Sequence, residues 1–306
     1  MSIKNILKIN QKKAIPALKL VTAIAAISTA SILIRAAQEN LSTIVIAAWR
    51  LVLSSVILMP VQYMKKIEEI KKLNTHSFAI AMLSGILLGL HFLSWIFSLS
   101  LTSVASSVVL VTTTPIWVAL VSPILLKESV NKKFFLGLSI SIFGIILITY
   151  GPLLVNHELR MNHLIHARGN FFALLGAFSA AGYMIAGRFL RERISTISYI
   201  SLVYTIAAVF VVFLSIFLQT SLFNVDGSDF FLLLLIALIP QVVGHSMINA
   251  ALGSLPAAVV SISLMGEPVG SALLALLFLN EVPTTAEWLG FVVILVGMYF
   301  SIKSEN

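Results

Sequence analysis

The chain contains one segment twice, and this repetition is the strongest constraint on its fold. Residues 105–144 recur as residues 258–297, at a constant offset of 153 residues and without a gap. The matches include a proline, a glutamate and two glycines, which coincide by chance less readily than apolar residues do: Pro115 with Pro268, Glu128 with Glu281, Gly137 with Gly290, and Gly144 with Gly297. Internal repetition of this length predicts a protein built from two similar halves.

The composition indicates that these halves lie in a membrane. Of the 306 residues, 59% are hydrophobic and 10% charged, whereas soluble domains carry about 25% charged residues. Ten apolar runs have the length of about 20 residues that an α-helix needs to cross a bilayer. They lie near 17–35, 41–63, 77–99, 102–126, 132–151, 168–187, 197–218, 229–251, 255–279 and 285–302. We therefore expect an all-α integral membrane protein with ten transmembrane helices.

The number of runs in each half fixes how the halves are related. Five runs in each half is an odd number, so the halves enter the membrane from opposite sides and form an inverted repeat, as in many secondary transporters. We expect residues 1–151 to form the first five-helix repeat, with a cytoplasmic tail at 1–16. We expect residues 152–167 to be an external linker, and residues 168–306 to form the second repeat.

The basic residues indicate the orientation. Of the 20 lysines and arginines, sixteen lie on segments that are cytoplasmic if the N-terminus is inside. Arg35, Arg160 and Arg168 lie on outer segments, and Arg50 lies within run 41–63. This bias follows the positive-inside rule and predicts that both termini are cytoplasmic, in a plasma membrane. Because the lysines cluster between apolar runs, the net charge of +8 does not indicate a nucleic-acid partner.

Four residues near helix starts have the pattern of caps. Thr284 and Glu287 have the spacing of a capping box at the start of run 285–302. Glu128 and Glu281 each precede the last run of their half, where a carboxylate can accept hydrogen bonds from free N–H groups.

Several motifs resemble one known family. They are Trp49-Arg50, the stretch 100–105, Thr114-Pro115, Leu126-Lys127-Glu128, the stretch 255–258, Glu267-Pro268-Val269 and Leu279-Asn280-Glu281. Together they are similar to the ten-helix, EamA-type members of the drug/metabolite transporter superfamily. The resemblance covers nearly the whole chain and implies secondary transport, most often efflux of amino acids or related compounds. Uptake of a cationic metabolite such as S-adenosylmethionine is a variation that it also allows.

The chain departs from the family pattern in two places. Asn280 stands where the family usually has glycine before the glutamate. The linker is longer than expected and contains His157, His163 and His166, whose spacing fits no metal-ligand motif, so we expect a solvated loop and no metal site.

Polar residues inside the apolar runs are candidate substrate-binding residues, because a charge in the bilayer centre usually faces a cavity. Glu267 lies near the middle of run 255–279, directly before Pro268, which cannot donate to a backbone carbonyl. A carboxylate beside a loosened backbone suits a cation, an amine or a proton. Its repeat mate is Thr114, before Pro115, and we expect both prolines to break their helices. The alternative is a structural glutamate that pairs with Arg50.

Arg50, two histidines and two of their neighbours complete the candidate set. Arg50 is suited either to a substrate carboxylate or to a pair with Glu267. His91 and His245 occupy matching positions in the two halves, and histidine titrates near physiological pH, so protons are a candidate coupling ion. Trp95 and Asn249 lie one helical turn beyond each histidine, and tryptophan offers a cation–π surface for an ammonium group. Hydrogen bonding and packing are the alternatives.

These observations favour a secondary carrier for a small polar metabolite, with a central cavity lined by runs 77–99, 102–126, 229–251 and 255–279. The direction of transport and the oligomeric state stay open. An intramembrane enzyme is disfavoured because the sequence has neither the G-x-S-x-G nor the H-E-x-x-H motif. A non-transporting scaffold would show no solute flux. We expect no cofactor, and the chain has no nucleotide-binding loop for ATP.

Overall fold

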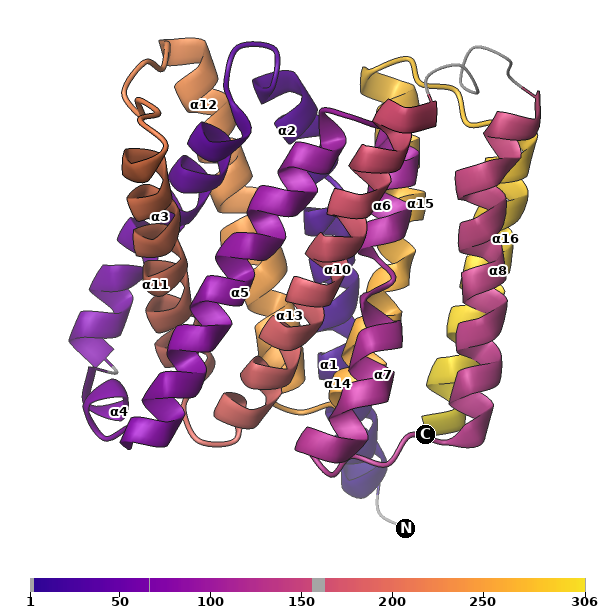
Figure 1. Cartoon of the computed structure of the whole chain (residues 1–306). Coiled ribbons are helices and arrows are strands. Elements are labelled where there is room, and N and C mark those ends of the chain that lie inside the picture. Colours follow the sequence, from indigo (N-terminus) through magenta and orange to yellow (C-terminus); the bar gives the residue numbers. More distant parts are fainter. Residues whose placement is uncertain (1–2, 66, 156–162, 306) are drawn as a thin grey trace.

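The computed structural model describes residues 3–65, 67–155 and 163–305, and the regular elements of these residues are all helices (Figure 1). The first half contains α1 (Ile3–Ile27), α2 (Ala30–Ala37), α3 (Thr43–Lys65), α4 (Ile67–Lys71), α5 (Thr75–Leu99), α6 (Val104–Val111), α7 (Thr114–Leu125) and α8 (Lys132–Val155). The second contains α10 (His163–Arg191), α11 (Thr196–Phe217), α12 (Gly227–Ile236), η1 (Ala237–His245), α13 (Ser246–Leu252), α14 (Ala257–Ser263), η2 (Leu264–Gly266), α15 (Glu267–Phe278) and α16 (Thr285–Glu305).

The predicted all-α membrane fold is confirmed, and the count of spans agrees approximately with the expected ten. Among the described residues, nine helical stretches are long and apolar enough to cross a membrane. A tenth element, the 24-residue α8, lies antiparallel along α16 at one edge of the molecule (Figure 1). Both termini and α4 lie at the same end of the bundle in this view, as five helices in each half require.

The two repeated segments form two broken helices. In the first half α6 ends at Val111 and α7 begins at Thr114, and in the second half α15 begins at Glu267. Helices α7 and α15 have 12 residues each and are offset by the 153 residues of the repeat. The half-helices pack crosswise, with α6 against α15 and α7 against α14. The two breaks therefore meet near the middle of the bundle (Figure 1).

The break in the first half follows from its sequence of three threonines and a proline. Pro115 cannot donate to the Val111 carbonyl, and the Thr114 hydroxyl donates to that carbonyl instead, at 2.9 Å. Thr112 and Thr113 donate to the carbonyls of Val109 and Leu110 in the same way. In lipid such carbonyls must find a partner within the protein. At the matching place in the second half Glu267 replaces Thr114, and a carboxylate has no proton to donate in this way.

The repeat extends to unusual backbone conformations. Lys127 and Asn280 are 153 residues apart, and both adopt positive φ angles, 57° and 55°. Asparagine tolerates this left-handed region better than most residues, and glycine tolerates it best. The position therefore needs this conformation, which explains why a glycine suits it in the resembling family.

Two predicted spans are less regular than the sequence indicated. Run 17–35 was expected as one helix, but it breaks between α1 and α2 at Ser28. There the Ser28 carbonyl accepts a hydrogen bond from Ser271. Run 229–251 contains the π-helical segment η1, whose Gln241 carbonyl accepts a bond from Tyr204 at 3.4 Å. Short π-helical segments inside α-helices are frequent at functional sites. At both irregularities a side chain from another helix donates to a backbone carbonyl.

The repeated glycines bring α8 and α16 into contact. A methyl group on Gly297 would lie 2.5 Å from the Gly137 carbonyl oxygen, and one on Gly144 would lie 2.7 Å from that of Gly290. No side chain fits at such distances, so the two helices approach as closely as small residues allow. The two glycine pairs of the repeat thus contact each other across the two halves.

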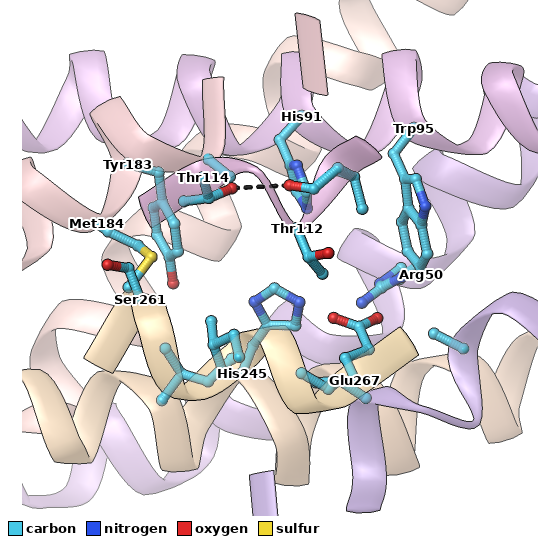
Figure 2. Close-up of a pocket in the computed structure, with 16 residues that line it drawn as sticks. Arg50, His91, Trp95, Thr112, Thr114, Tyr183, Met184, His245, Ser261 and Glu267 are labelled. Atoms are coloured by element: carbon cyan, nitrogen blue, oxygen red, sulfur yellow. Dashed lines mark hydrogen bonds between the residues drawn. The ribbon is translucent and has the colours of Figure 1, made fainter. Parts of the chain in front are cut away.

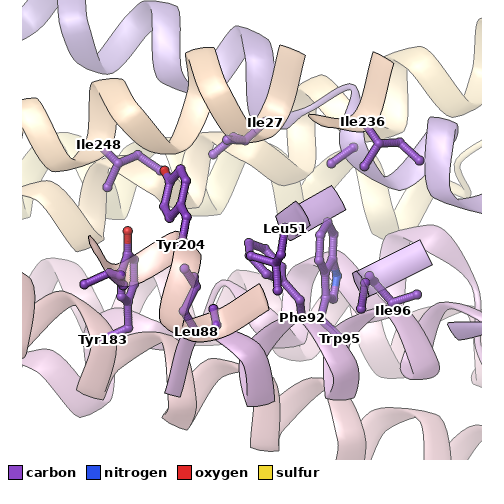
Figure 3. Packing of buried hydrophobic residues seen from close by; sticks show 14 of the residues in the cluster. Ile27, Leu51, Leu88, Phe92, Trp95, Ile96, Tyr183, Tyr204, Ile236 and Ile248 are labelled. Carbon is purple, nitrogen blue, oxygen red and sulfur yellow. The ribbon is translucent and has the colours of Figure 1, made fainter. Parts of the chain in front are cut away.

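The interior is apolar and so is much of the outer surface. Leu51, Leu88, Phe92 and Tyr204 pack in the buried cluster that surrounds the centre of the bundle (Figure 3). On the outside, large apolar side chains such as Ile124, Phe217 and Leu277 are more than 70% exposed. Lipid tails, not water, suit such a surface.

Side chains hold the ends of the helices. Thr284 and Glu287 form a reciprocal capping pair, with the Thr284 N–H bonded to Glu287 Oε2 at 2.6 Å. Glu128 differs from the expectation, because it caps α14 of the other half rather than the helix that follows it: Oε2 accepts the Ala257 N–H at 2.9 Å.

The segments that were expected to be a linker and a tail contain helical residues. Helix α8 continues to Val155 and α10 begins at His163, so helices enter the range 152–167 from both sides. Helix α1 begins at Ile3, within the expected tail. Residues 156–162 and the side chains of the three linker histidines lie outside the described part of the structure.

Candidate functional site

A cavity lies where the two broken helices meet (Figure 2). The expectation named four lining runs, and the structure adds residues from α1, α2, α3 and α10. The lining residues are Ile27, Ala30, Arg50, His91, Trp95, Val111, Thr112, Thr114, Ala180, Tyr183, Met184, His245, Ile248, Ser261, Leu264 and Glu267. Six of the seven candidate substrate-binding residues are among them.

The cavity is narrow in this conformation. Its volume is about 60 Å³, and one buried water needs roughly 10–15 Å³ measured in the same way. The space accommodates several water molecules, so a larger solute requires a wider cavity.

Glu267 is at the first position of α15, where the preceding turn is the 3₁₀ segment η2. Its side chain points into the cavity (Figure 2) and the residue is 8% exposed. No hydrogen bond to its carboxylate is found from the described residues, while its backbone carbonyl accepts one from Ser28 at 3.4 Å. The carboxylate is thus free to bind a partner in the cavity.

Arg50 faces this carboxylate from α3 (Figure 2). The residue is fully buried, and its Nε donates to Gln241 Oε1 at 2.7 Å. Its guanidinium carbon lies 3.9 Å from the centre of the Phe92 ring, a cation–π contact. Within the described residues, Nη1 and Nη2 have no hydrogen-bond partner, and no nitrogen of Arg50 is within 4.0 Å of a Glu267 oxygen. The two charges face each other without a salt bridge.

The two histidines meet beside these charges. The His91 and His245 ring centres are 6.3 Å apart. His91 Nδ1 lies 2.9 Å from the Gly176 carbonyl oxygen and therefore carries the hydrogen of that bond. In the neutral ring this leaves Nε2 as an acceptor. His245 Nδ1 has no partner among the described residues.

Trp95 and Thr114 line the cavity but are partly engaged. The Trp95 ring stacks on His91 at 6.1 Å and 10°, and the Arg50 guanidinium carbon lies 6.0 Å from the indole centre. The Thr114 hydroxyl donates to the Val111 carbonyl, so it can serve a solute only as an acceptor. Whether these residues contact a solute stays a prediction.

Asn249 does not line the cavity. It is fully buried, and its Nδ2 donates to the Tyr183 hydroxyl at 2.5 Å. Tyr183 does line the cavity, so Asn249 is connected to the site through this tyrosine. Ser84 and Tyr199 form a further hydrogen bond at 2.7 Å behind it.

Sequence reasoning missed Gln241 and Tyr183. Pro240, directly before Gln241, was a local signal of irregular backbone, and a glutamine inside an apolar run was a second. Tyr183 offered no such signal, because tyrosine is common in helix packing. No group of three or more His, Cys, Asp or Glu side chains that could hold a metal is found in the described part of the chain.

Comparison with known proteins identifies the relationship. The EamA-like transporter family matches residues 14–150 and again residues 167–303. A protein described as "Uncharacterized transporter YdfC", from Bacillus subtilis (strain 168), is 24% identical over 197 residues, which are 64% of this chain and 62% of that protein. A solved crystal structure is 16% identical, covers 94% of this chain and 96% of its own, and superposes with a TM-score of 0.73, which shows the shared fold.

Proposed function

The chain belongs to the EamA-like transporter family, and on that premise we propose that it is a secondary carrier that exports an amino acid or a related amine-bearing solute by alternating access. Family membership assigns membrane transport of a small molecule across the lipid bilayer. The identity of the solute, the direction of transport and the coupling ion are our proposal.

The observation that carries the proposal is the free Glu267 carboxylate in the central cavity. A buried carboxylate is costly unless it has a partner, and the described residues provide no hydrogen bond to it. An ammonium group in the cavity would supply both the opposite charge and the hydrogen-bond donors. The position also fits, because inverted-repeat transporters bind their solutes near the bilayer midplane, at discontinuous helices.

Export is the direction that the family resemblance favours. The second candidate is uptake of a cationic metabolite such as S-adenosylmethionine, which would also suit Glu267. Protons are a candidate coupling ion because two histidines line the cavity, and exchange without protons is the alternative. We place the protein in the plasma membrane with both termini cytoplasmic, on the basis of the lysine and arginine bias.

Counterflow in proteoliposomes tests the proposal. Vesicles loaded with an unlabelled amino acid should accumulate the same labelled amino acid, with saturation and with competition from other amine-bearing solutes. A screen of amino acids, nucleosides and polyamines for thermal stabilisation would choose the first solutes, because a ligand that binds only the folded state raises stability. Absence of flux for every stabilising solute would contradict transport at this site and favour a scaffold.

Direction requires a second measurement. In inverted membrane vesicles an exporter accumulates its solute, and in right-side-out vesicles an importer does. Accumulation of S-adenosylmethionine in right-side-out vesicles alone would contradict export and support the second candidate.

A further inference from the structure

The cavity has two poles of opposite charge, and the positive pole lacks an acceptor. Arg50 Nη1 and Nη2 and the Trp95 indole N–H are buried donors that have no partner in the described structure. Gln241 holds Arg50 Nε, and Phe92 covers the guanidinium face. The guanidinium is therefore oriented before any solute enters, with both terminal nitrogens unsatisfied.

We propose that Arg50 binds a carboxylate of the solute while Glu267 binds its ammonium group, so that the carrier selects small zwitterions over simple amines. This inference rests on the proposed function, because it uses the same cavity. An arginine fork matches a carboxylate with two parallel hydrogen bonds. Burying unpaired donors is unfavourable, and a solute carboxylate satisfies both nitrogens at once.

The remaining walls define the rest of the solute. Ile27, Val111, Met184, Ile248 and Leu264 supply apolar surface around the charged pair. An apolar side chain on the zwitterion gains from contact with these residues, and a second positive charge would find no carboxylate besides Glu267 among the lining residues. The site therefore suits neutral amino acids with apolar side chains.

A matched series of solutes tests the assignment in the unmodified protein. Leucine carries both charged groups, leucinamide and 3-methylbutylamine lack the carboxylate, and 4-methylpentanoate lacks the amine. We expect leucine to compete in counterflow about 10- to 100-fold more effectively than the other three, because one lost charge-assisted hydrogen bond corresponds to one or two factors of ten.

The outcomes separate this inference from the proposed function. If the two amines compete as well as leucine, Arg50 does not bind the solute carboxylate. The proposed function, transport of an amine-bearing solute, remains supported in that case. If 4-methylpentanoate, which lacks the amine, competes as well as leucine, Glu267 does not bind the ammonium group. That result would contradict the proposed function. The Arg50→Lys variant keeps one charge but loses the fork, so it should weaken leucine binding and leave competition by 3-methylbutylamine unchanged. Equal losses for both solutes would overturn the role of Arg50.

A second inference concerns the two ends of the bundle, where an arginine of one half meets a glutamate of the other. At the end with both termini, Arg188 Nε lies 2.5 Å from Glu128 Oε1, and Glu128 also caps α14 through Ala257. At the opposite end, Arg35 lies 3.6 Å from Glu281. The repeat offset of 153 residues relates Arg35 to Arg188, and it also relates Glu128 to Glu281.

The two pairs are in different states. Arg188 and Glu128 have side chains 18% and 16% exposed, whereas those of Arg35 and Glu281 are 30% and 38% exposed. Each arginine also donates to the end of a long span, Arg188 to the Leu252 carbonyl and Arg35 to the Leu99 carbonyl, which are again 153 residues apart. One end is therefore held tightly while its symmetric counterpart is looser.

We infer that these pairs are alternating latches. The Glu128 pair holds α14 against α10 and closes the cavity toward the end with the termini. In the other state the halves exchange conformations, so that the Glu281 pair tightens and the Glu128 pair opens. Rocking of one repeat against the other around a central site provides this motion.

The chain has no cysteine, which permits a direct test by thiol labelling. Ser261→Cys places one thiol in the cavity, and a membrane-impermeant maleimide is added to sealed vesicles from either side. With Glu128→Gln, we expect severalfold faster labelling from the side that carries the termini. With Glu281→Gln, we expect faster labelling from the opposite side.

A matched control and a second variant complete the test. Glu68→Gln removes an exposed pair with Lys71, 2.8 Å long, and should change labelling from neither side. If Glu128→Gln does not fold, Arg188→Lys weakens the same pair and should give the same change. Unchanged labelling in the latch variants, or equal acceleration from both sides, would overturn the inference.

Discussion

The imidazole rings of His91 and His245 lie 6.3 Å apart in the central cavity, one contributed by each half of the molecule. Arg50 lines the same cavity from α3. Three groups that can all carry positive charge are thus gathered around one buried carboxylate, Glu267. Movement of a solute or of Glu267 changes the charges that surround the two histidines.

This arrangement predicts that a proton gradient drives transport through His245. The His245→Gln variant cannot take up a proton at this position, so solute accumulation driven by a pH gradient should be lost while counterflow without a gradient continues. His76→Gln, at the far end of α5 and packed against Phe189, is the control and should behave as the unmodified protein. If the unmodified protein accumulates solute equally with and without a pH gradient, proton coupling is contradicted.

Replacement of Glu267 separates recognition from structural support. Glu267→Gln keeps the size and removes a buried charge that makes no salt bridge, so we expect an unchanged or higher melting temperature. Counterflow of amine-bearing solutes should weaken about 10- to 100-fold, as the loss of a charged hydrogen bond implies.

The alternative for Glu267 predicts a different pair of results. If Glu267 supports Arg50, its replacement leaves an uncompensated buried cation, which typically costs about 3–5 kcal/mol. Loss of folding in Glu267→Gln, restored by the second change Arg50→Met, would contradict the recognition role. Normal affinity in a well-folded variant would contradict it as well.

The glycine contact between α8 and α16 predicts a destabilising alanine. Alanine in a helix interior is usually favoured over glycine by roughly 0.5–1 kcal/mol. The Gly297→Ala methyl group would lie 2.5 Å from the Gly137 carbonyl oxygen, so we expect a loss of about 1–3 kcal/mol from overpacking. Thermal unfolding in detergent measures it. Gly227→Ala is the control, since its methyl group meets nothing within 4 Å, and an equal loss there would exclude the contact as the cause.

The charge distribution predicts the topology. A reporter that works only in the cytoplasm should be active when it is fused at residue 70 or 306. A reporter that works only outside the cytoplasm should be active when it is fused at residue 160. The common end of the termini and α4 in the bundle supports this arrangement (Figure 1). An external signal at residue 306 would contradict the ten-helix topology.

The sequence alone determined the architecture, because its signals are local or periodic. Runs of about 20 apolar residues fix the spans, an odd number in each half fixes the inversion, and Pro115 and Pro268 locate the breaks. Glu267 was identifiable because a carboxylate inside an apolar run must face a cavity or a partner.

Only the tertiary structure decided which side chains meet. These helices are apolar on nearly all sides, so no amphipathic pattern in the sequence says which face turns inward. Helix rotation brings Arg50 to Gln241 and Phe92, turns Asn249 toward Tyr183 and away from the cavity, and carries Glu128 to α14 instead of the next helix. Contacts between residues more than 100 positions apart depend on the packing of all ten spans, which local sequence patterns do not encode.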